Sequence, residues 1–90
     1  MSLQELRDQI DKIDEQIINL LVVRNEVITQ VAQQKEALSL PTLQIGREEE
    51  VLQKLYKYAS QKGLSGQFTT NLFKMIMDES KRIQDEKRNK

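Results

Sequence analysis

The sequence predicts an all-α protein, and two features indicate this. Glycine and proline are rare and fall into two clusters, around 39–46 and 63–66, which divide the 90-residue chain into three segments. In each segment apolar residues recur at helical spacings of three and four, and none alternates like a strand. We therefore expect one domain of three helices, at about 3–38, 46–62 and 66–86.

The first predicted helix is too long for a chain of this size. It opens with Ser2 and Glu5, which are spaced as a capping box. Its apolar stripe consists of Leu3, Leu6, Ile10, Ile13, Ile17 and Leu20, and then Val27 and Val31. A helix of about 35 residues is roughly 50 Å long, whereas a compact domain of this size has a radius of gyration of about 12 Å. The stripe therefore needs a partner chain to cover it.

The second and third helices carry their own start and stop signals. Glu48 lies in the first turn of the second helix, where the helix dipole favours negative charge. Gly63 is a natural residue for the end of that helix, and Ser65 can cap the next one. The tail at 85–90 is strongly charged, and we expect it to fray.

Composition excludes several kinds of function. Fourteen basic and fourteen acidic side chains cancel, so no overall field favours nucleic acid or a membrane. The chain has neither cysteine nor histidine, which removes thiol chemistry, the usual general base and the commonest metal ligand. It shows no secretion signal and no apolar run long enough to span a bilayer. We expect a soluble cytoplasmic protein whose function uses Lys, Arg, Asp, Glu and neutral polar groups.

Two cations lie in an apolar lane of the first helix. Counting sevens from Leu3 brings Arg24 to a seam position, where a guanidinium is costly unless an anion or acceptor meets it. Lys35 follows eleven residues later, only about 20° around the helix. The two long side chains could converge on one small dianion. Alternatively, Arg24 sets the register of a coiled coil or forms an internal ion pair, and Lys35 is a solvated residue near a helix C-terminus.

Other polar residues are weaker signals when taken singly. Arg7 precedes Arg24 by 17 residues, which places it roughly 25 Å away along the helix. One chain cannot bring both arginines to one small ligand, but an antiparallel second chain could. Taken alone, Arg7 is most simply interpreted as a surface charge. Ser80 and Gln84 extend the apolar lane of the third helix, either to orient a ligand or because the stripe reaches solvent there.

Taken in order, these residues resemble the all-helical chorismate mutase family. The resemblance rests on Leu6-Arg7-Asp8-Gln9-Ile10-Asp11-Lys12-Ile13-Asp14, Leu20-Leu21 with Arg24, Lys35, Ile45-Gly46-Arg47-Glu48, and Ser80 with Gln84. It covers about residues 3–86. It implies an intertwined helical homodimer that rearranges chorismate to prephenate in phenylalanine and tyrosine biosynthesis, a branch of the shikimate pathway. It implies no cofactor and no metal.

The resemblance also implies catalytic and binding roles. Arg24, together with Arg7 of the partner subunit, would hold the two carboxylates of chorismate. Lys35 and Gln84 would donate hydrogen bonds to the ether oxygen whose bond breaks.

The remaining implied contacts are at the ring and at one carboxylate. Glu48 would accept a hydrogen bond from the ring hydroxyl, and Arg47 would help to fix that end of the substrate. Ser80 would assist with a carboxylate. Gln44 departs from the pattern, since well-known members carry an aspartate at this position that contributes to the pocket.

The implied reaction suits a chain without histidine or cysteine. A Claisen rearrangement needs no nucleophile, proton transfer or redox group, only orientation of the substrate and stabilisation of charge growing on the ether oxygen. Two alternatives stay open. One is an isochorismate pyruvate lyase of the same fold, which Arg47, Glu48 and Ser80 disfavour. The other is a non-catalytic helical dimerisation module. Similar domains also form parts of longer enzymes with prephenate dehydratase, prephenate dehydrogenase or DAHP synthase.

Overall fold

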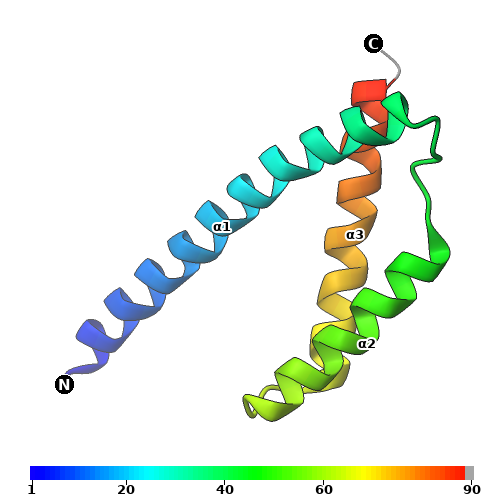
Figure 1. The fold of residues 1–90 in the computed structure, drawn as a ribbon. Helices are drawn as coiled ribbons and strands as arrows, with labels where there is room; N and C mark the ends of the chain where they lie inside the picture. The colour runs from blue at the N-terminus through cyan, green and yellow to red at the C-terminus, as the bar shows by residue number, and fades with distance from the viewer. Residues whose placement is uncertain (89–90) are drawn as a thin grey trace.

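Residues 1–88 form three helices, as the sequence predicts (Figure 1). The structure, a computed structural model, describes residues 1–88. In it α1 spans Leu3–Ala37, α2 spans Ile45–Gln61 and α3 spans Gly66–Arg88, and these 88 residues contain no strand. These bounds agree with the expected ones to within two residues.

The predicted fraying of the tail is wrong for the part of the tail that the structure describes. Helix α3 continues to Arg88, whose guanidinium donates to the Thr42 hydroxyl at 3.2 Å. Basic residues in the last turn also interact favourably with the negative end of the helix dipole. The rest of the expected tail, residues 89–90, lies outside the described residues.

Helix α1 has a defined structure at both ends. The predicted capping box is present, with the Ser2 hydroxyl accepting from the Glu5 amide and the Glu5 carboxylate accepting from the Ser2 amide. At the other end Ser39 adopts a left-handed conformation, with φ of 56°. The amide of Leu40 bonds the Lys35 carbonyl at 2.7 Å, which completes a Schellman-type stop. This stop fixes the helical turn that carries Lys35.

A tight turn joins α2 and α3 into a helical hairpin. Gly63 has φ of 80°, as a left-handed stop requires, and the Leu64 amide returns to the Ala59 carbonyl at 2.9 Å. Ser65 caps α3 as predicted, because its hydroxyl accepts from the Phe68 amide at 3.1 Å. Gly66 allows close packing of the two helices, since a Cβ there would lie 2.5 Å from the Tyr56 ring.

Helix α3 lies at the centre of the arrangement and packs against both other helices (Figure 1). It contacts α2 along the hairpin and the C-terminal half of α1. The side chains buried among these contacts include three polar ones, all on α3: Thr69, Ser80 and Gln84. No helix in residues 1–88 is long and apolar enough to cross a membrane.

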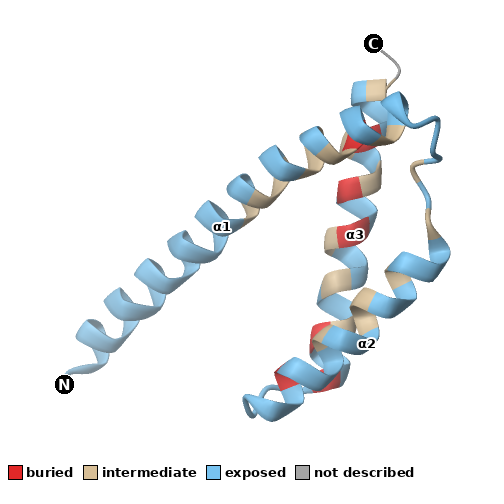
Figure 2. Ribbon diagram, viewed as in Figure 1, coloured by how far each residue is buried: buried red, intermediate tan, exposed pale blue. Residues whose placement is uncertain are grey.

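The N-terminal half of α1 projects away from the rest of the molecule (Figures 1 and 2). The radius of gyration is 16.3 Å, well above the roughly 12 Å of a compact domain of this length. The apolar stripe of this segment is exposed over its whole length, at Leu3, Leu6, Ile10, Ile13, Ile17 and Leu20. Ile13, for example, keeps 58% of its surface accessible. The single chain therefore leaves this stripe uncovered.

Candidate active site

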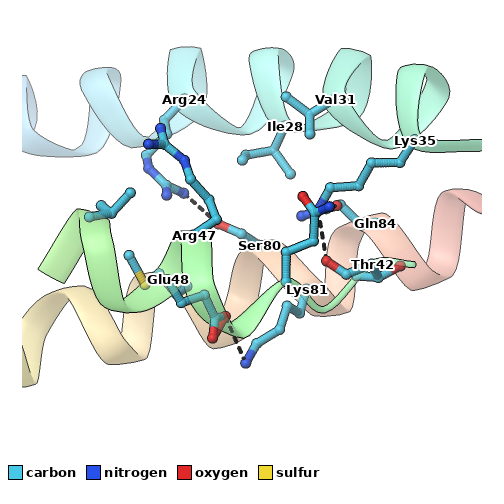
Figure 3. Close-up of a pocket in the computed structure, with 13 residues that line it drawn as sticks. Arg24, Ile28, Val31, Lys35, Thr42, Arg47, Glu48, Ser80, Lys81 and Gln84 are labelled. Atoms are coloured by element: carbon cyan, nitrogen blue, oxygen red, sulfur yellow. Dashed lines mark hydrogen bonds and ion pairs between the residues drawn. The ribbon is translucent and has the colours of Figure 1, made fainter. Parts of the chain in front are cut away.

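A cavity of about 290 Å³ lies between the C-terminal half of α1, the start of α2 and the C-terminal half of α3. Its volume is close to the lower end of the range for small-molecule pockets, about 300 Å³. Its lining includes Arg24, Ile28, Val31, Lys35, Thr42, Gln44, Arg47, Glu48, Val51, Met77, Ser80, Lys81 and Gln84. Figure 3 shows Ile28 and Val31 on α1 between the two cations Arg24 and Lys35. The pocket thus has an apolar middle with a cation at each end.

Arg24 is held at its end of the pocket by a neutral partner. Its guanidinium donates to the Ser80 hydroxyl, which in turn donates to the Ile76 carbonyl at 2.9 Å. No carboxylate in residues 1–88 forms an ion pair with Arg24. The internal ion pair considered above is therefore not formed within this part of the chain, and the guanidinium keeps its charge for another partner.

Lys35 marks the opposite end of the pocket. Its ammonium donates to the Gln84 side-chain oxygen at 2.9 Å and to the Thr42 carbonyl at 2.7 Å. An ammonium has three N–H donors, so one remains. Because Gln84 accepts through its oxygen, its NH₂ group is left as a donor as well. Two donors with different charges therefore lie together at this end.

Burial affects the acid–base properties of both cations. The pKa of Arg24 is lowered because burial disfavours its charged form. The pKa of Lys35 is lowered first by burial and then by repulsion from Arg88, while attraction to Glu48 raises it. An arginine nevertheless keeps its proton in proteins. The pocket thus holds partly desolvated positive charge, which favours an anionic ligand.

Helix α2 lines the pocket with charged residues that form ion pairs. The Glu48 carboxylate pairs with Lys81 of α3 at 3.0 Å, and the two side chains are 27% and 31% exposed, respectively. Lys81 also lies 3.4 Å from Asp78. Arg47 borders the pocket, but its guanidinium is 63% exposed and pairs with Glu50 at 3.4 Å.

All but one of the candidate site residues named from the sequence line this cavity: Arg24, Lys35, Gln44, Arg47, Glu48, Ser80 and Gln84. The exception is Arg7, which is exposed on the projecting half of α1. Gln44 is the N-cap residue of α2 and makes no side-chain capping hydrogen bond. An aspartate at this position would be a stronger helix cap than glutamine and would add a negative charge.

Two residues of the site were missed in the sequence. Thr42 acts on Lys35 through its backbone carbonyl, which any residue could supply, so side-chain chemistry gave no signal. Lys81 pairs with Glu48 across two helices, and such a pair depends on how the helices pack rather than on local spacing.

Comparison with known protein families identifies the family of this chain. Residues 6–85 match the family described as chorismate mutase type II. The chain belongs to that family. The resemblance seen in the sequence is thereby confirmed.

Several relatives show the same relationship. The chorismate mutase of Methanocaldococcus jannaschii is 27% identical over 91% of this chain and 83% of its own length. The 4-amino-4-deoxychorismate mutase of Streptomyces venezuelae is 30% identical, over 92% and 81% respectively. A bifunctional chorismate mutase/prephenate dehydratase of Buchnera aphidicola is 35% identical over 88% of this chain. The chain spans only 20% of the length of that bifunctional relative.

A solved structure has the same fold. The conserved hypothetical protein from Pyrococcus furiosus superposes with a TM-score of 0.70 and 35% sequence identity. The match covers 91% of this chain and 93% of that one. The three-helix arrangement is therefore shared with a protein of nearly the same length.

Proposed function

We propose that this protein is a mutase that converts chorismate to prephenate in phenylalanine and tyrosine biosynthesis. The observation that carries the proposal is the pair Arg24 and Lys35, which line one cavity and have no carboxylate partner within residues 1–88. Chorismate is a dianion, so it supplies the negative charge that the pocket lacks. Arg24 with Ser80 would bind one carboxylate, and Lys35 would face the ether oxygen.

The proposed mechanism uses orientation and electrostatics alone. The pocket holds the enolpyruvyl arm over the ring, so that the new carbon–carbon bond forms as the carbon–oxygen bond breaks. Negative charge grows on the ether oxygen in that transition state. The remaining N–H of Lys35 and the NH₂ of Gln84 would donate to this oxygen. Because both donors are held in place before reaction, little reorganisation is needed.

We further propose an intertwined homodimer with shared sites. The exposed stripe on the N-terminal half of α1 is apolar, so the same stripe on a second copy could pack against it and bury both. Arg7 lies on this half, too far from its own Arg24 to meet the same ligand. An antiparallel partner would bring Arg7 of the partner subunit to this chain's pocket. The second carboxylate of chorismate would bind there.

A product assay tests the proposed reaction. Purified protein is incubated with chorismate or with isochorismate, and the products are identified by chromatography and mass spectrometry. Prephenate from chorismate supports the proposal. Pyruvate and salicylate from isochorismate would instead identify the lyase, and no product from either would favour the non-catalytic dimerisation module.

A second substrate has specific support. The Streptomyces venezuelae relative, named 4-amino-4-deoxychorismate mutase, matches most of both chains. By its name that substrate carries an amino group where chorismate carries its ring hydroxyl. Including it in the same assay decides which of the two compounds is preferred.

The variant Gln84→Glu should make activity depend on acid. Only a protonated carboxyl can donate to the ether oxygen, and Lys35 at 2.9 Å would stabilise the ionised form of the introduced group. Activity should therefore rise as pH falls below neutrality, while the wild type stays nearly level from about pH 6 to 8. The control is Gln67→Glu, at an exposed position of the same helix. Full activity of Gln84→Glu at pH 8 would show that Gln84 is not the ether donor.

Removing Arg88 should move the alkaline limit of activity upward. Lys35 must be protonated to donate, so activity is lost as pH rises through its lowered pKa. Arg88→Met removes a repulsion that lowers this pKa, and the alkaline limb of kcat should shift to higher pH. Arg82→Met, which removes a cation paired with Glu79, serves as control. An unchanged limb in Arg88→Met would mean that Lys35 does not limit activity in alkali.

The dimer should be lost together with helical structure on dilution. Because the α1 stripe is exposed in one chain, a monomer would have little to hold its N-terminal half in place. Light scattering and circular dichroism across one dilution series should report a single coupled transition. Ile13→Glu should weaken the dimer far more than Lys12→Glu, its neighbour off the stripe. A stable helical monomer would contradict the intertwined architecture.

A further inference from the structure

The ion pair between Glu48 and Lys81 lies in the wall of the pocket. Glu48 has a proposed contact with the substrate, but Lys81 has no role in the reaction as described above. Lys81 reaches one oxygen of Glu48, Oε1, at 3.0 Å. Figure 3 shows the two side chains pointing toward each other, away from α1 and its two cations. The hydrogen bond to Glu48 raises the pKa of Lys81 above its usual value, so this ammonium stays charged throughout the physiological range.

The pair changes what Glu48 can offer to a ligand. A carboxylate has two oxygens, and the ion pair joins Lys81 to Oε1, so Oε2 keeps the capacity to accept from another donor. A neutral hydroxyl can donate to Oε2 without disturbing the ion pair. An ammonium group at the same place gains its full attraction only by competing with Lys81 for the carboxylate. The ion pair between Glu48 and Lys81 therefore favours a hydroxyl over an ammonium group on the ligand.

The charges of the whole pocket strengthen this difference. Within residues 1–88 four cations line it, Arg24, Lys35, Arg47 and Lys81, and Glu48 is the one lining carboxylate. Two carboxylates outside the lining also contact these cations: Glu50 pairs with Arg47, and Asp78 lies 3.4 Å from Lys81. The first three cations are suited to the carboxylates and the ether oxygen of a dianionic ligand. A cationic substituent on the ligand would add a charge of the sign that the lining already has in excess. Glu48 is the lining carboxylate that could offset it, and its charge is already partly balanced by Lys81, which also contacts Asp78.

We propose that Lys81 is a specificity-determining residue, which makes the pocket select a ligand with a neutral ring hydroxyl over one with an ammonium group at the position facing Glu48. The inference rests on the proposed function, since it assumes that the ring of chorismate lies against Glu48. Lys81 acts through Glu48, so it is a positioning residue that need not touch the substrate.

Paired substrates and a matched set of variants test the inference. The kcat/KM is measured for chorismate and for 4-amino-4-deoxychorismate, at a pH where the amino group is protonated. Where neither compound is turned over, the Kd of each is measured by calorimetry instead. The enzymes are wild type, Lys81→Met, Lys81→Arg and the control Lys74→Met, which removes an exposed lysine of the same helix outside this pocket. Met keeps much of the aliphatic stem and removes the charge, while Arg keeps the charge. Circular dichroism checks that each variant is folded.

The wild type should prefer chorismate, and Lys81→Met should shift the ratio of the two substrates about tenfold toward the amino compound. Lys81→Arg and Lys74→Met should keep the wild-type ratio within about twofold, which separates charge from packing. An unchanged ratio in Lys81→Met, or an equal shift in Lys81→Arg, overturns the inference. A wild type that binds both ligands with this ratio yet turns over neither overturns the proposed function instead, because the ratio of Kd values is measured without reaction.

Discussion

Replacing Lys35 by alanine should lower kcat by on the order of a hundredfold or more. Lys35 is held at one end of the pocket by Gln84 and Thr42, with one N–H still available. We assign that donor to charge that exists only in the transition state, so its loss should appear in kcat rather than in KM. Steady-state kinetics of prephenate formation measures the effect.

Arg47→Ala is the matched comparison, and its effect should be smaller and mainly on KM. The Arg47 guanidinium is 63% exposed and already pairs with Glu50, so little of its charge is directed only at the transition state. Lys12→Ala, an exposed lysine of α1 outside the pocket, should leave both constants unchanged. Small, equal effects of Lys35→Ala and Arg47→Ala would place the reacting bond elsewhere.

The fold was predictable because several of the helix ends carry local signals. The Ser2 and Glu5 box, Gly63 and Ser65 all form the contacts that their residue types favour. These contacts involve residues within a few positions of one another, so the sequence alone contains them. The end of α3 was misjudged because Arg88 is held by Thr42, a contact across 46 positions.

From helical spacing alone, the candidate site was predictable only where polar residues interrupt an apolar lane, whereas Gln44, Arg47 and Glu48 were named through the family resemblance. Arg24 and Lys35 stand out because helical spacing places them on one face of α1, and the structure puts them in one cavity. Contacts between helices could not be predicted from helical spacing. The Lys81 and Glu48 pair depends on the packing of α3 against α2, and the Thr42 carbonyl carries no side-chain signature.

Arg7→Ala and Arg24→Ala homodimers should each be nearly inactive, and mixing them should restore activity. The two arginines are 17 positions apart on one helix. Arg7 lies on the N-terminal half of α1, which projects away from the rest of the molecule. In a two-fold dimer each pocket then uses Arg24 of one chain and Arg7 of the partner subunit. Under the proposed binding mode, loss of either arginine would remove a charge that holds one carboxylate of the substrate.

The two variants are unfolded together, refolded in equal amounts and assayed with chorismate. About half of the dimers should be mixed, and each mixed dimer has one pocket with both defects and one with neither. Half of the dimers with half of their pockets intact should give about a quarter of wild-type activity. Lys12→Ala mixed with Arg24→Ala is the control for refolding, and subunit exchange is verified by mass spectrometry. If exchange is complete and the Arg7→Ala and Arg24→Ala mixture remains inactive, then both arginines serve one chain's pocket or Arg7 serves none, and the shared-site dimer is wrong.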